Sequence, residues 1–72
     1  MQTNLPNGYT VSVIGDGYGS HKGLLEIACW ETASGDWCKS EPFNGDVIGW
    51  QTKEQISEII SLVLSWPWIG EI

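Results

Sequence analysis

The segment of residues 52–67 is the one stretch whose apolar residues follow a helical period, and it decides the layout of the chain. Its apolar stripe consists of Ile56, Ile59, Ile60 and Val63. Thr52 followed by Gln55 is a capping box, which begins a helix, and Pro67 ends it. The sequence therefore predicts a single C-terminal helix over about residues 53–66.

Upstream of this helix, apolar and polar residues alternate, which is the pattern of half-buried strands. The alternation predicts a strand at about residues 9–14, a second strand follows at about residues 24–31, and the hairpin loop described next places a third at about residues 37–41. A four-residue hairpin loop at 32–35 pairs Trp30 with Trp37, and a tighter turn at Ser34-Gly35 would shift the pairing by two without changing the faces. The predicted fold class is α+β, a three-stranded antiparallel β-sheet with the helix packed on one face.

One face of this sheet is free of charge until its end, and we assign it to the core beneath the helix. Its members are Val11, Val13, Leu25, Ile27 and Cys29. The other face carries Glu26, Lys39 and the two paired tryptophans. The helical stripe is expected to pack against the first face, because burial of apolar surface is the main term that stabilises so small a fold.

The chain has 72 residues, which predicts one domain over residues 1–72. Nine acidic residues and three lysines give a net charge of -6. Direct binding to nucleic acid is excluded by this balance, because phosphate binding needs a basic surface. Anionic membrane surfaces are disfavoured for the same reason. The composition favours a protein partner with a basic surface.

No residue pattern predicts catalysis, a metal or a cofactor, so we expect a non-enzymatic protein. His21 is the only histidine, and together with Cys29 and Cys38 it is too few ligands for structural zinc. We find no secretory signal and no membrane span, and therefore expect a cytoplasmic protein with reduced cysteines. A Cys29–Cys38 disulfide stays open as the alternative, because the hairpin places the two in cross-strand reach.

Five tryptophans are many for a chain of this length. Trp30 and Trp37 fall on the sheet face away from the helix, and two interpretations of them stay open. Either the tail of residues 66–72 covers them as a second small core, or they form an exposed patch, since tryptophan is enriched at binding hot spots. The predicted partner-binding residues are Trp30, Trp37, Glu26, Glu31, Asp36 and Glu41.

Residues 5–9 lead into the first predicted hairpin, and residues 46–50 lead to the capped terminal helix. With its small size and acidity, this layout resembles small phage- or prophage-encoded accessory proteins, including anti-CRISPR inhibitors. The resemblance implies an inhibitor of a host defence or nucleic-acid-handling complex that acts in the host cytoplasm by steric or charge mimicry of nucleic acid. The alternative is an assembly domain that forms a homodimer through its Trp-rich sheet face or a free strand edge.

Overall fold

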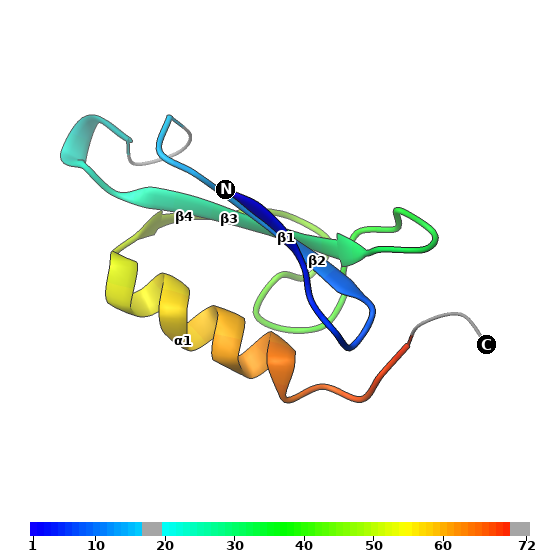
Figure 1. Cartoon of the computed structure of the whole chain (residues 1–72). Coiled ribbons are helices and arrows are strands. Elements are labelled where there is room, and N and C mark those ends of the chain that lie inside the picture. Colours follow the sequence, from blue (N-terminus) through cyan, green and yellow to red (C-terminus); the bar gives the residue numbers. More distant parts are fainter. Residues whose placement is uncertain (17–19, 70–72) are drawn as a thin grey trace.

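The computed structural model describes residues 1–16 and 20–69, which form two layers, an antiparallel sheet and a helix lying across one of its faces (Figure 1). The strands are β1 (Gln2–Asn4), β2 (Tyr9–Ile14), β3 (Leu25–Glu31) and β4 (Ile48–Gln51), in that order across the sheet. A short 3-10 helix, η1 (Ser20–Lys22), precedes β3, and the helix α1 (Lys53–Leu64) follows β4. The predicted α+β class, with an antiparallel sheet and a C-terminal helix, is confirmed.

The sheet has four strands, whereas the sequence predicted three. The predicted strand at 37–41 is wrong, because within this range only Trp37 pairs with β3, in an isolated bridge to Trp30. β4 lies beside β3 in its place, and β1 adds a strand at the other edge. β1 consists of exposed polar residues, so it has no apolar alternation from which a strand could be predicted.

The loop of residues 38–47 leaves the sheet because Phe43 is drawn into the core. The Phe43 side chain is only 2% exposed and belongs to the main apolar cluster. The carbonyl oxygen of Cys38 accepts a hydrogen bond from the Gly45 N–H at 2.8 Å, which closes the loop on itself instead of on β3. The loop therefore lies on the same side of the sheet as α1 (Figure 1).

The turn at residues 32–35 has the register that its four-residue length predicts. The Glu31 N–H donates to the Asp36 carbonyl at 2.8 Å, and the Cys38 N–H donates to the Cys29 carbonyl at 3.1 Å. Gly35 has a φ of +78°, the left-handed conformation that closes such a loop. Trp30 therefore lies directly opposite Trp37.

The sheet face that we assigned to the core is the face that α1 covers. The buried residues of the sheet and helix in this cluster are Val11, Ile27, Cys29, Ile56 and Val63. Partly buried residues around them are Val13, Leu25, Ile59 and Ile60. The helical stripe thus points to the sheet as predicted, but Ile59 and Ile60 lie at the margin of the core instead of inside it.

Side chains cap both ends of α1. At its start, the Thr52 hydroxyl accepts from the Gln55 N–H at 3.2 Å, and the Gln55 side chain accepts from the Thr52 N–H at 2.8 Å. The predicted capping box is confirmed. At the other end, the buried Asn7 side chain donates to the carbonyl oxygens of Val63 and Trp66 at 2.7 and 3.3 Å. This second cap ties the turn between β1 and β2 to the end of the helix.

Candidate protein-binding site

Trp30 and Trp37 form a cross-strand pair on the sheet face away from α1. Their bridge is flanked by hydrogen bonds on both sides, so they occupy a non-hydrogen-bonded position, where facing side chains are closest. The ring centroids are 6.3 Å apart and the ring planes are inclined by 48°. The neighbouring Cys29 and Cys38 are buried in the core, so the alternation of the strand sends both indoles to the open face. Trp37 is 45% exposed.

A small network of side-chain hydrogen bonds lies beside the tryptophan pair. Thr10 lies directly opposite Trp30 in the β2–β3 register and is buried, although it belongs to the open face. Its hydroxyl is 2.6 Å from the Thr32 hydroxyl and donates to the Asn4 side chain at 2.9 Å. These hydrogen bonds join β1, β2 and the residue that follows β3 on the side of Trp30 away from Trp37, which favours an ordered platform over an adaptable one.

The described part of the C-terminal tail packs elsewhere. The Trp66 ring meets Tyr9 at a centroid distance of 5.1 Å and Phe43 at 6.3 Å. The Ile69 N–H donates to the Asn7 carbonyl at 2.8 Å. Trp66 thus packs on the side of the sheet that α1 covers, whereas Trp68 lines a hollow with residues that include Asn4 and Thr32. Residues 70–72 of the tail lie outside the described residues.

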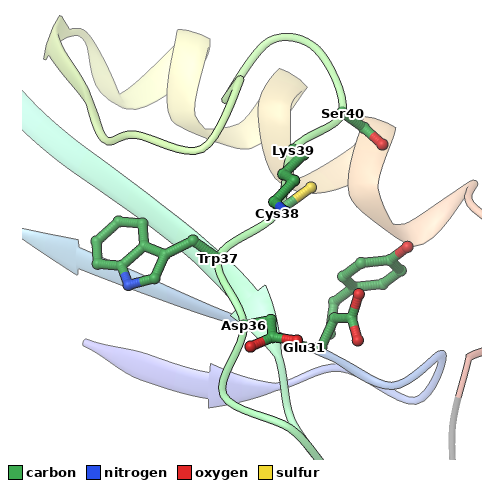
Figure 2. A pocket seen from close by; sticks show the side chains of 7 residues that line it. Glu31, Asp36, Trp37, Cys38, Lys39 and Ser40 are labelled. Atoms are coloured by element: carbon green, nitrogen blue, oxygen red, sulfur yellow. The ribbon is translucent and has the colours of Figure 1, made fainter.

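The structure divides the predicted acidic residues between two faces. Glu26 is on the same strand face as Trp30, opposite Ile14 in the register. Glu31 and Asp36 lie on the other face, and Figure 2 shows the Trp37 indole pointing away from their carboxylates. Glu41 is exposed in the 38–47 loop. The acids therefore do not form one rim around the tryptophan pair.

Glu31 and Asp36 instead line a hollow of about 190 Å³ at the end of the sheet (Figure 2). The other residues that line it are Tyr9, Trp37, Cys38, Lys39 and Ser40. The Glu31 carboxylate accepts a hydrogen bond from the Ser34 hydroxyl at 3.1 Å. Burial, and then the neighbouring Cys38 and Glu31, raises the pKa of the Tyr9 hydroxyl above its usual value. Two carboxylates make this hollow suited to a basic side chain.

Cys29 and Cys38 are both free thiols and both buried. Burial, followed by the neighbouring Cys38, raises the pKa of the Cys29 thiol to about 12. A thiol with this pKa stays protonated at neutral pH and is a poor nucleophile. The pair is therefore part of the core and not a reactive site.

Stability is expected to fall as the pH rises above about 9, because the unfolded Cys29 thiol loses its proton near 9.0 and the folded one only near 12. Between these values the folded state binds more protons, so the free energy of unfolding falls by up to about 1.4 kcal/mol per pH unit. Urea unfolding from about pH 8 to 10.5 measures this slope. Cys29→Ala should show a shallower slope, and equal slopes would exclude this thiol as the cause.

Sequence reasoning did not single out Trp50. This residue is 50% exposed, has a φ of +63°, and makes an edge-to-face contact with His21 at 5.1 Å. The sequence treated it only as part of the approach to the helix, because a positive φ at tryptophan leaves no signal in composition or periodicity.

The fold and the tryptophan pair, in which Trp30 is partly buried and Trp37 exposed, define a small two-layer α+β protein with an aromatic surface patch. No protein-family model matches the chain, and the searches of curated proteins and of solved structures returned no match. Within residues 1–16 and 20–69, no three His, Cys, Asp or Glu side chains are grouped so that they could hold a metal ion. No helix in this part of the chain is long and apolar enough to cross a bilayer.

Proposed function

We propose that this chain is a non-enzymatic protein-binding module that inhibits a nucleic-acid-handling complex of a host cell. The observation that carries the proposal is the Trp30–Trp37 pair, which lies on the sheet face opposite α1 with Trp37 45% exposed. Tryptophan is among the residues that contribute most binding energy at protein interfaces. A rigid cross-strand pair presents this apolar area without first having to be ordered.

The charge of the chain supports a basic partner. A net charge of -6 attracts a surface rich in arginine and lysine and speeds the encounter with it. Such surfaces are typical of proteins that bind nucleic-acid phosphates. By covering one, the chain excludes the nucleic acid by steric or charge mimicry, as the resemblance to anti-CRISPR inhibitors implies. We place this action in the cytoplasm of the host.

The hollow beside Glu31 and Asp36 supplies a second point of contact for such a partner. Both carboxylates line it, and Trp37 forms part of its wall while also belonging to the tryptophan pair. A basic side chain of the partner in this hollow therefore meets Trp37 from the side opposite its indole, so a partner that wraps this end of the sheet contacts both the hollow and the aromatic patch. Aromatic contact and charge attraction act together at one end of the sheet.

The proposal is tested by capture from host cytosol on the immobilised chain, followed by a functional assay of the captured protein. The captured protein should bind its nucleic acid less tightly as the chain is added, measured by fluorescence anisotropy. Its affinity for the chain should fall more than tenfold between roughly 50 and 500 mM salt, because exposed charges are screened.

A matched pair of charge variants separates the contribution of the hollow from net charge. Glu31→Gln with Asp36→Asn should weaken binding several-fold at low salt. Glu54→Gln with Glu58→Gln removes the same charge from exposed positions on α1 and should have a smaller effect. Equal affinity for wild type and both variants would exclude charge mimicry. A chain that only forms dimers by light scattering would instead support the assembly alternative.

A further inference from the structure

Trp50 lies in a backbone conformation that tryptophan rarely adopts. Its φ is +63°, in the left-handed region where a bulky side chain is strained. Among the described residues, the other non-glycine residue with a positive φ is Asn44, and asparagine tolerates this region well. Strain of this kind is concentrated at functional sites, so the position of Trp50 calls for an explanation beyond backbone preference.

This strain does not bury the indole. β4 is bulged here, with an extra residue between the Leu25–Gln51 and Ile27–Ile48 pairs. Bulges change the direction of side chains at sheet edges and beside functional sites. Trp50 is directed to solvent and is 50% exposed, so the bulge displays a large apolar side chain that the core does not use.

His21 in η1 contacts the exposed indole. The two ring centroids are 5.1 Å apart and the ring planes are inclined by 88°. In an edge-to-face contact of this kind, the imidazole covers at most one face of the indole. Half of the Trp50 surface remains exposed beside this contact, so a ligand has indole surface to contact while His21 stays in place.

Trp50 and Trp37 flank the same edge of β3. Trp37 lies opposite residue 30, and the bulge that contains Trp50 lies opposite residue 26. Four residues of strand separate these positions, which is about 13 Å. An ordinary protein interface buries about 800 Å² on each side, so one partner spans both tryptophans.

We infer that Trp50 is a second anchor of the same interface and that its exposed indole surface receives an arginine guanidinium of the partner. This inference rests on the proposed function. The net charge of -6 selects a basic partner. Tryptophan is the strongest cation–π ring, and the planar, weakly hydrated guanidinium stacks on it better than the lysine ammonium.

The first test is the variant Trp50→Gly, which removes the indole and the strain together. Its melting temperature should stay the same or rise by a few degrees, because glycine adopts a positive φ freely. A fall of more than about 5 °C would show that Trp50 is retained for packing, and would overturn the inference.

The second test uses a hexa-arginine peptide as the probe and the tryptophan indole N–H signals of the whole chain in NMR. As the peptide is added, the Trp50 signal should shift until the site is saturated. Trp50→Gly should lower the affinity for the peptide about fivefold. Trp68 is 57% exposed and is the control: its signal should shift less, and Trp68→Gly should bind normally. A neutral hexa-citrulline peptide should leave the Trp50 signal in place. Equal shifts at Trp50 and Trp68, or normal binding by Trp50→Gly, would overturn the inference.

Capture of the partner separates this inference from the proposed function. If Trp37→Ala loses the partner and Trp50→Gly binds it normally, the role of Trp50 is overturned and the proposed function stands. A partner that both variants hold as tightly as the wild type removes the proposed interface itself. Reduced capture by both variants, with melting temperatures unchanged, supports both.

Discussion

Replacing Phe43 with alanine is expected to lower the free energy of unfolding by about 3–5 kcal/mol, a large share of what a small domain possesses. The side chain is 2% exposed and its ring meets Trp66 edge-to-face at 6.3 Å. It therefore joins the 38–47 loop to the segment after α1. Its removal leaves a cavity that the loop can refill only by moving.

Urea unfolding followed by circular dichroism measures this loss. Trp68→Ala is the matched control, because it also deletes an aromatic ring but from a position that is 57% exposed. We expect the control to stay within about 1 kcal/mol of the wild type. A loss below about 1 kcal/mol for Phe43→Ala would contradict the role of Phe43 as the anchor of the loop.

Trp37→Ala is expected to weaken partner binding by about 2 kcal/mol, or roughly thirtyfold, while the fold stays in place. The indole is 45% exposed and lies on the face away from the core, so its removal opens no internal cavity. The cross-strand contact with Trp30 is the ring contact that is lost from the folded state. Such a contact contributes about 0.2–1 kcal/mol to stability.

The melting temperature and the partner affinity, or the dimer constant, are measured on the same sample. Trp68→Ala again serves as the control, since it removes an exposed indole, 57% against 45% for Trp37, from the tail. If melting falls by many degrees and binding per folded molecule is unchanged, Trp37 belongs to the folded core and the aromatic patch is not the binding site.

Local patterns predicted those parts of the fold that local interactions determine. The capping box at Thr52 and the apolar stripe of α1 are spaced by the helix itself, and the 32–35 turn fixes its own register. The odd-numbered positions of β2 and β3 share one face because the strand period is two. In each case the residues that form the feature lie close together in the sequence.

The parts that could not be predicted depend on contacts between distant residues. Residues 37–41 follow the turn in register with β3, but the burial of Phe43 moves the chain away from that strand. β1 contains no apolar residue from which a strand could be predicted, and it is stabilised by its pairing with β2. For residues 37–41, the burial of Phe43 outweighs the local preference for a strand. For β1, pairing with β2 forms a strand where the local sequence has no such preference.

The candidate site shows the same division. The length of the turn alone predicts that Trp30 faces Trp37, and the structure confirms this pairing. Grouping Glu31 and Asp36 with them followed from closeness in sequence, although the strand period already assigns Glu31 to the opposite face. Trp50 could not be found this way, because its exposure depends on a bulge in a strand that the sequence did not predict.

The hydrogen bonds by which Asn7 caps α1 join residues that are synthesised early to residues that are synthesised late. Asn7 and Trp66 are 59 positions apart, and the Asn7 carbonyl also accepts from Ile69. While the chain is being synthesised, β2 and β3 therefore emerge before α1 and the segment after it. Until then their apolar faces are uncovered and accessible to chaperones. Contacts of such sequence separation also close slowly. For this protein, native structure is completed only after residues 63–69 have left the ribosome, because the cap on α1 needs both ends of the described chain.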